Sequence, residues 1–328
     1  MRTILSLMLA VLIIGGGLAY GETPERKQIT VSAQWKLGPS TAYWVIAKEK
    51  GFYDNLGFKV NIVGLMGSTK TIVALEAGQV DMGCPSGYAL VKARGTGLKA
   101  KMLLCYVPKP QLGVIYHTNR GIASPKDLEG KTIGGVPGTG DLLLLSSYCK
   151  SHGINIEKIK IEQLSYAVLH GMFFEGKLDG ITTFLPYLPR FRNDGHKVDA
   201  FPYEDYNVYF NGLSATEKFI KENPVTVRRF VQATQKAFAW IYENPKESID
   251  LYFSAQPELK GDNPEVDYEA FKLVMSTQYD KTSKIKGVGW MSETKWKKTM
   301  QFAAEHFEAE INFAPNELFT NEFLLPKK

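Results

Sequence analysis

The chain has 328 residues, of which 44% are hydrophobic, and its 39 lysine and arginine residues outnumber 34 aspartate and glutamate residues by five. This composition excludes an intrinsically disordered chain and a multi-span membrane protein, and three cysteines are too few for a disulfide-built scaffold. The small positive charge is spread thinly, so no nucleic-acid partner is expected, and the length predicts two domains.

The first predicted element is an apolar run at the N-terminus. A single arginine precedes it, residues 4–14 are almost entirely apolar, and Ala19 and Gly21 stand at the −3 and −1 positions of a cleavage site. This layout is typical of a secretory signal peptide at residues 1–21. The run is also just long enough for an uncleaved membrane anchor, which stays open as the alternative. A lipoprotein is not expected, because no cysteine lies near the cleavage site.

Downstream of residue 28 the chain alternates strand-like and helix-like segments, which is typical of mostly parallel sheets covered by helices. The first series predicts strands at 29–33, 59–65, 80–83 and 99–107 and helices at 41–50, 68–77 and 86–94. After the two prolines of 108–110, a second series predicts strands at 112–117, 132–136, 159–164 and 180–184, a capped turn at 124–128 and a helix at 139–151. Helical spacing dominates from residue 217 onward, as at 225–242 and 295–308. The chain is therefore expected to form two open α/β sheets.

Cys84, Cys105 and Cys149 are odd in number and widely spaced. At most one disulfide can form among them, and the sequence does not say which pair, if any, would join. No two of them form a C-x-x-C motif, so we expect buried small side chains and no metal or redox role.

Loops that follow strands are the expected ligand-binding positions, because the ligand crevice of an open α/β sheet lies at the carboxyl ends of its strands. The loop after the first strand offers Trp35 and Tyr43 as flat rings with one polar atom each. The turns at 66–69 and 138–141 contain small residues that let the backbone approach a ligand closely. Neither turn has the spacing of a phosphate-binding loop.

Enzyme signatures are mostly missing from the chain. No two of its five histidines have H-x-x-x-H spacing, and there is no G-x-S-x-G motif. No metal or cofactor is expected. An exported enzyme with His117 or His170 as its base stays open as an alternative.

Several segments resemble a known family. They are VIAKEKGFY at 45–53, ALEAGQVDMG at 74–83, LEGKTIG at 128–134 and GKLDG at 176–180, followed by Phe238, Ala239, Trp240 and the Glu243, Asn244, Pro245 run. These segments look like the periplasmic substrate-binding proteins of ABC importers. More narrowly, they resemble the family that binds thiamine-pyrimidine precursors, alkanesulfonates, taurine and nitrate.

The resemblance implies a two-lobed periplasmic binding protein fold of type II-like architecture, with an open, mostly parallel sheet in each lobe and helices on both of its faces. A cleft between the lobes would close on one small molecule by hinge bending. The chain would cross between lobes near 107–111 and 205–209. Residues 22–107 together with 210–328 would form the first lobe, and residues 108–209 the second.

Thirteen residues are candidate ligand contacts, from the loops to which the resemblance points and from aromatic and polar positions near predicted strand ends. They are Trp35, Ser40, Thr41, Tyr43, Ser68, Thr69, Ser86, Tyr88, Thr139, Asp141, Thr183, Phe184 and Tyr187. No arginine occurs in these loops, which departs from what a dedicated sulfonate or nitrate site is expected to contain. Helix N-termini can nevertheless hold an anion without one.

The function implied is that of an exported, non-enzymatic solute-binding component, acting as a monomer in the periplasm and delivering its ligand to an ABC permease in the inner membrane. The many aromatic residues favour a planar heterocycle such as a pyrimidine-type precursor, or an aromatic acid. Sulfonate, taurine or nitrate binding and a sensory module remain alternatives. Some eukaryotic relatives make a thiamine pyrimidine by consuming their own residues and carry a cysteine-rich motif, which the three dispersed cysteines do not match.

Overall fold

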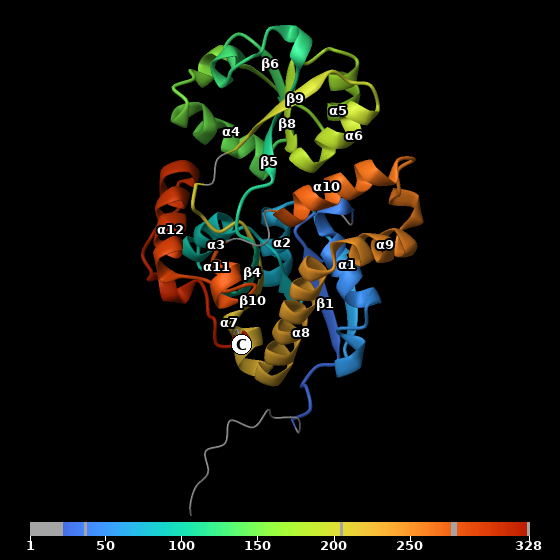
Figure 1. Cartoon of the computed structure of the whole chain (residues 1–328). Helices are drawn as coiled ribbons and strands as arrows, with labels where there is room; N and C mark the ends of the chain where they lie inside the picture. The colour runs from blue at the N-terminus through green and yellow to red at the C-terminus, as the bar shows by residue number, and fades with distance from the viewer. Residues whose placement is uncertain (1–21, 36–37, 204–205, 277–280, 327–328) are drawn as a thin grey trace, which may run out of the picture.

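The computed structural model describes residues 22–35, 38–203, 206–276 and 281–326. Two lobes lie end to end, each built around its own β-sheet (Figure 1). The predicted signal peptide, residues 1–21, lies outside the described residues. Among the helices that the structure describes, none combines the length and apolar character needed to cross a membrane.

The first lobe contains a five-stranded sheet. Its strands are β1 (Gln28–Ala33), β2 (Lys59–Gly64), β3 (Met82–Gly83), β4 (Ala100–Val107) and β10 (Asn211–Thr216), in the order β2-β1-β3-β10-β4. β1 pairs in parallel with β2 and β3, whereas β10 runs antiparallel to β3 and β4. Four of the five strands therefore share one direction.

The second lobe repeats this plan. Its strands are β5 (Leu112–His117), β6 (Thr132–Gly135), β7 (Lys160–Gln163), β8 (Gly180–Phe184) and β9 (Val198–Pro202), in the order β7-β6-β8-β5-β9. Here β6 is parallel to β7 and β8, and β5 is antiparallel to β8 and β9. The predicted fold class, two open and mostly parallel sheets, is confirmed.

The antiparallel strand of each sheet is the one that follows a crossing between the lobes. β4 ends at Val107 and β5 begins at Leu112, while the return crossing runs from the end of β9 at Pro202 to the start of β10 at Asn211. β4 ends at the carboxyl edge of the first sheet, and the short crossing brings the chain into β5 at the edge of the second sheet that faces the first lobe. The carboxyl ends of the parallel strands in both sheets consequently face the same space between the lobes.

Helices cover both sheets (Figure 1). They are α1 (Ala42–Glu49), α2 (Ser68–Glu76), α3 (Gly87–Gly95), α4 (Gly140–Ser151), α5 (Tyr166–Phe174), α6 (Leu188–Asn193), α7 (Glu217–Glu222), α8 (Pro224–Glu243), α9 (Pro245–Ala255), α10 (Pro264–Ser276), α11 (Lys281–Lys286) and α12 (Glu293–Phe307). α1 packs against α8 and α9, and α3 packs against α12. Residues far apart in sequence thus enclose the first sheet.

The long helix α8 buries the apolar stripe that its sequence predicts, including Val227, Phe230 and Ile241. Thr234 is the one polar residue predicted on this stripe, and it is fully buried. Its hydroxyl donates to the carbonyl of Phe230 at 2.8 Å and lies 3.2 Å from the hydroxyl of Tyr53. The polar interruption is therefore satisfied inside the core.

Helix α10 touches both lobes. It packs against α6 and against the 3₁₀ turn η6 (Leu185–Tyr187) of the second lobe, and also against α9. The carbonyl of Val274 accepts a hydrogen bond from Gln111 Nε2 at 2.5 Å, in the first crossing segment. The C-terminal region that the sequence assigns wholly to the first lobe therefore also contacts the second.

Three elements, α5 and β9 in the second lobe and β10 in the first, are not predicted from the sequence. In α5 apolar residues occur on every side, so the segment has no helical period, and only Leu169 and Phe173 are buried. β9 and β10 consist largely of small or polar residues and a proline and have weak strand propensity. Their positions are set by pairing with β5 and β4, which are distant in sequence.

The three cysteines are free and buried. Burial raises the pKa of the Cys84 thiol to about 12 and that of the Cys149 thiol to about 11, which disfavours the reactive thiolate. We expect no thiol to react with Ellman's reagent in the native protein within minutes and three to react in denaturant. A native protein that releases one equivalent at once, or a denatured one that yields a single thiol, would contradict this arrangement.

Candidate functional site

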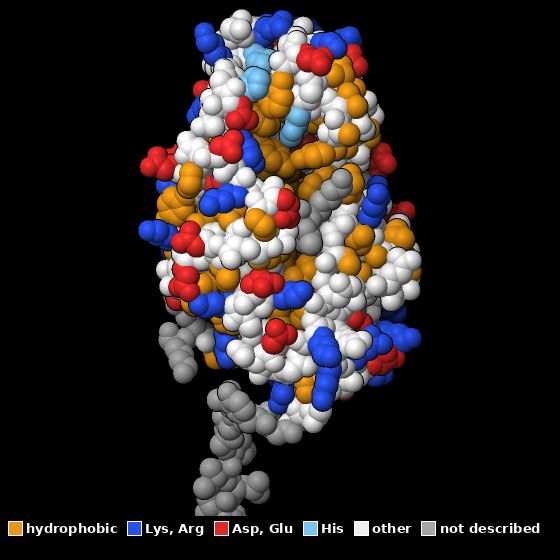
Figure 2. Space-filling view, turned by 90° about the vertical axis from the view of Figure 1, so that its right-hand side faces the viewer, with side chains coloured by type: hydrophobic (Ala, Val, Ile, Leu, Met, Phe, Trp, Pro, Cys, Tyr) orange, Lys and Arg blue, Asp and Glu red, His pale blue; other side chains and the backbone are white. Residues whose placement is uncertain are grey.

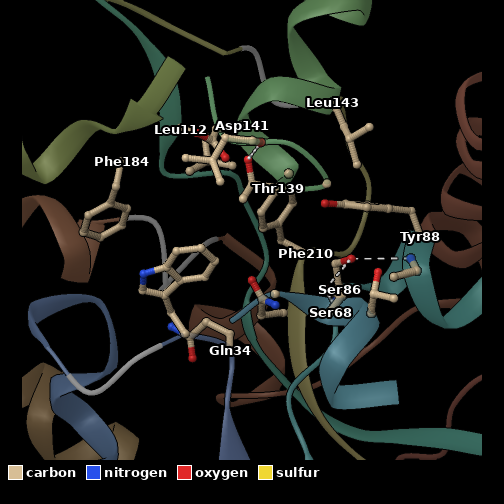
Figure 3. Close-up of a pocket in the computed structure, with 18 of the residues that line it drawn as sticks. Gln34, Ser68, Ser86, Tyr88, Leu112, Thr139, Asp141, Leu143, Phe184 and Phe210 are labelled. Carbon is tan, nitrogen blue, oxygen red and sulfur yellow. Dashed lines mark hydrogen bonds between the residues drawn. The ribbon is translucent and has the colours of Figure 1, made fainter. Parts of the chain in front are cut away.

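A cavity of about 570 Å³ lies between the lobes, at the carboxyl edges of both sheets. Its walls come from loops and helix starts of both lobes, and in Figure 3 Thr139 and Asp141 face Ser68, Ser86 and Gln34 across it. Figure 2 shows hydrophobic side chains gathered around the hollow between the lobes. The volume suits a small organic molecule.

Gln34, directly after β1, organises the floor of the cavity. Its side-chain Nε2 donates to the carbonyl of Ser40 and to the hydroxyl of Tyr43, both at 2.6 Å, and its Oε1 accepts from the hydroxyl of Tyr106 at 2.7 Å. Every polar atom of this amide therefore has a partner. These hydrogen bonds hold Ser40 beside Gln34, and both Trp35 and Ser40 line the cavity wall.

Two predicted contacts in this loop, Thr41 and Tyr43, do not line the cavity. Both side chains are buried in the first lobe. The hydroxyl of Thr41 donates to the carbonyl of Gly38, and the Tyr43 ring packs edge-on against Tyr106 and Phe238. They follow Ser40 at the start of α1, on the side of the helix that faces the core, so the structure places these two predicted residues outside the cavity wall.

The starts of α2 and α3 are joined by a pair of serines. Ser68 Oγ accepts a hydrogen bond from the backbone N–H of Ser86 at 2.9 Å, and the two hydroxyls lie 3.2 Å apart. Ser86 Oγ also accepts from the backbone N–H of Ala89 and so caps α3. Both serines line the cavity, as does the exposed Thr69 beside them.

Tyr88 reaches from α3 to the second lobe. A Cβ atom added at Gly140 would lie only 2.7 Å from the Tyr88 hydroxyl, so this close approach requires a glycine at the start of α4. The ring stacks on Phe307 with 4.7 Å between centroids and meets Phe210 edge-on at 5.6 Å. Aromatic residues thus close one side of the cavity.

A second aromatic group closes the opposite side. The hydroxyls of Tyr166 and Tyr187 lie 2.7 Å apart. Trp35 meets Tyr166 edge-on at 6.1 Å, and Phe184 meets Tyr187 edge-on at 5.6 Å. These rings come from both lobes, and flat faces of this kind suit a planar ligand.

Asp141 is the carboxylate of the cavity wall. It sits in the first turn of α4, where the hydroxyl of Thr182 is 3.4 Å from its Oδ2. Burial raises its pKa to about 6, an effect that hydrogen bonds from Thr139 and Thr182 oppose. No arginine lines the cavity within the described residues, and Lys92, exposed on α3, is the one lysine there.

Eleven of the thirteen predicted residues line the cavity, all except Thr41 and Tyr43. The sequence missed several others, namely Gln34, Lys92, Gln111, Leu143, Tyr166, Phe210, Asn211 and Phe307. Gln34 could have been found, because it precedes Trp35 in the same strand-following loop. Asn211 is the first residue of β10, a strand that the sequence did not predict, and Phe210 directly precedes it.

Neither of the two histidines considered as bases lines the cavity. A ring nitrogen of His117 is 2.8 Å from the carbonyl of Phe173, on whose ring the imidazole stacks. His170 lies among the rings of Tyr166, Tyr187 and Phe191, and burial lowers its pKa. Within the described residues, no group of three His, Cys, Asp or Glu side chains could hold a metal ion.

Residues 39–248 match the model of a family described as NMT1/THI5 like. This chain belongs to the NMT1/THI5-like family. Its relatives include the riboflavin-binding protein RibY of Chloroflexus aurantiacus, 24% identical over 92% of this chain and 87% of that protein. The formylaminopyrimidine-binding protein of Halalkalibacterium halodurans is 23% identical over 78% of this chain and 79% of its own length.

The NMT1/THI5-like relatives also include an enzyme. The 4-amino-5-hydroxymethyl-2-methylpyrimidine phosphate synthase THI13 of Saccharomyces cerevisiae is 23% identical over 72% of this chain and 73% of that protein. Among solved structures, the alkanesulfonate-binding protein SsuA of Xanthomonas axonopodis pv. citri, bound to MOPS, superposes with a TM-score of 0.70. It is 15% identical and covers 90% of this chain and 99% of its own, so this likeness concerns the fold, that of periplasmic binding proteins.

Proposed function

We propose that this NMT1/THI5-like protein is the exported solute-binding component of an ABC importer, and that it captures a planar nitrogen heterocycle whose N–H groups face Asp141. The observation that carries the proposal is a cavity between two lobes with aromatic rings on two sides, one partly buried carboxylate and no arginine among its described wall residues. The binding proteins for riboflavin and formylaminopyrimidine among the relatives support it.

The charge of Asp141 favours a nitrogen heterocycle with N–H groups over a sulfonate or nitrate anion as the ligand. At neutral pH most of this carboxyl is ionised, since its pKa is about 6, and an ionised carboxylate repels a sulfonate or nitrate anion. A ligand N–H group would instead give it a charge-assisted hydrogen bond. Lys92 is the cationic side chain found on the described wall, and it lies in the last turn of α3, whereas Asp141 lies in the first turn of α4.

The transport cycle that we propose uses the two crossing segments as a hinge. Residues 108–111 and 203–210 join the sheets, and the carbonyl of Pro108 accepts a hydrogen bond from Lys295 Nζ at 2.8 Å. Closing would bring the aromatic groups of both lobes onto the ligand. A monomer in the periplasm, docking on a membrane permease and performing no chemistry on its ligand, completes the proposal.

A ligand panel tests this function. At pH 7.5 we expect riboflavin, 4-amino-2-methylpyrimidine or indole to stabilise the protein, by about 2.7 kcal/mol at 100 times the Kd of the compound that binds. Taurine, ethanesulfonate and nitrate should add nothing, and W35A should lose the stabilisation. Calorimetric titration and thermal unfolding measure this. Stabilisation by the sulfonates or nitrate alone would overturn the proposed ligand class.

A further inference from the structure

The cavity is larger than one aromatic ring requires. An apolar cavity of about 150 Å³ already holds a benzene molecule, whereas this one measures about 570 Å³. It follows α3 from Ser86 to Thr96, a distance of about 15 Å at 1.5 Å per residue. In Figure 3 Tyr88 and Leu143 lie on one side of Thr139 and Asp141, and Phe184 lies on the other.

The extension beyond Tyr88, here named the α3 arm, has mostly apolar walls. It is lined by Ile72, Val73, Ala89, Lys92, Ala93, Thr96, Leu143 and Phe307. Val73 is 56% exposed and Leu143 is 42% exposed, although they come from helices of opposite lobes and line one cavity. Aliphatic side chains exposed toward a cavity from both sides are covered well by an apolar part of a ligand.

A cation lies at the outer end of the α3 arm. Lys92 is in the last turn of α3 and has no carboxylate partner in the part of the chain that the structure describes. Arg94, two residues later, is instead held by Glu217 at 2.8 Å and Glu317 at 2.6 Å. The hydroxyl of Thr96 donates to the carbonyl of Ala93. The free ammonium of Lys92 is thus the group available to an anion at this end.

We propose that the ligand has two parts: an aromatic ring between Trp35, Tyr166 and Asp141, and an alkyl chain that follows the α3 arm to a carboxylate beside Lys92. This inference rests on the proposed function for the ring and adds the chain and its charge. The class of ligand is therefore a heteroaryl alkanoate, neutral at the ring and anionic at the end of the chain.

A homologous series separates the two parts. Indole tests the ring alone, because it has an N–H donor and no chain, and indole-3-acetate, indole-3-propionate and indole-3-butyrate lengthen the chain. We expect the Kd to fall about fourfold for each methylene, the value for burying one such group. Indole-3-butyramide, which lacks the charge, should bind about two- to fivefold more weakly than indole-3-butyrate.

Three variants test whether the alkyl chain lies in the α3 arm and whether its charge lies beside Lys92. V73W fills the arm from its exposed side and should remove the dependence of the Kd on the length of the alkyl chain. I285W, at a residue of similar exposure on α11 outside the cavity wall, is the matched control and should change nothing. K92Q should make the acid and the amide of the butyrate equal in affinity.

The outcomes distinguish this inference from the proposed function. If indole binds but the chain length has no effect, or if V73W leaves the dependence intact, the two-part ligand is wrong and the ring site stands. If neither indole, the acids nor the aromatic compounds of the panel bind, both proposals fail.

Discussion

Replacing Asp141 with asparagine is expected to stabilise the ligand-free protein at pH 7.5 and to weaken the binding of N–H donor ligands at the same pH. The folded-state pKa of this carboxyl, about 6, is raised above its ordinary value of 3.8 because the group is buried. The folded state therefore binds the proton more tightly than the unfolded state. This tighter proton binding adds to the free energy of unfolding. The contribution is fully present below pH 3.8 and is lost as the pH rises through 6.

Above pH 6 the ionised Asp141 costs the folded protein on the order of 2 to 3 kcal/mol, which D141N removes because asparagine carries no charge. The gain in the free energy of unfolding should be smaller at pH 4.5, where the folded protein keeps the carboxyl protonated. Urea denaturation at the two pH values measures this. Asp194, an exposed carboxylate at the end of α6, provides the control variant D194N, which should show no such difference.

The same substitution is expected to weaken indole binding about tenfold at pH 7.5, because a neutral acceptor replaces a charged one. D141N should also bind sulfonates more tightly than the unmodified protein does, because the repulsion between the carboxylate and the sulfonate anion is removed. Groups facing Asp141 do not titrate in this range: burial raises the pKa of the Tyr88 hydroxyl to about 12 and raises that of the Tyr203 hydroxyl well above its ordinary value. A D141N protein with unchanged stability and unchanged indole affinity at pH 7.5 would contradict the role given to this carboxylate.

The second large effect is expected for Q34L. Leucine is one carbon shorter than glutamine and cannot hydrogen-bond, so the hydroxyl of Tyr106 loses its acceptor and Tyr43 loses its donor. Both tyrosines are buried, and a buried polar group without a partner costs about 1 to 3 kcal/mol. We expect the free energy of unfolding to fall by about 2 to 4 kcal/mol, measured by urea denaturation.

A double variant separates this cost from lost packing. In Q34L/Y106F both partners of one hydrogen bond are removed together, so part of the lost stability should return. Y106F alone should be milder than Q34L. Should Q34L prove as stable as the unmodified protein, Gln34 would not be the organising residue of the first loop.

The alternation of strands and helices was predictable because each segment has a local pattern of apolar residues. Most of the predicted cavity residues were found by the rule that ligands bind at the carboxyl ends of strands. Residues such as Ser68, Ser86 and Thr139 follow from this rule directly. Tyr43 shows its limit, since the rule does not say on which side of α1 a ring lies. The packing of the core decides that, through Tyr106 and Phe238.

Residues brought in by distant pairing could not be predicted. Asn211 lines the cavity because β10 inserts between β3 and β4. The local sequence of β10 does not predict that position in the sheet. Phe307 ends a helix that lies more than 200 residues from Tyr88, on which it stacks. The charge balance of the cavity, with Asp141 inside it and no arginine on its described wall, also emerges only when both lobes are in place.

The most direct test of the central claim is native mass spectrometry of the protein purified from its native host without refolding. We predict a bound small molecule that, once released, shows the ultraviolet absorbance of an aromatic heterocycle. D141N and W35A proteins prepared in the same way should have largely lost it. An aliphatic sulfonate, taurine or nitrate as the bound compound would contradict it.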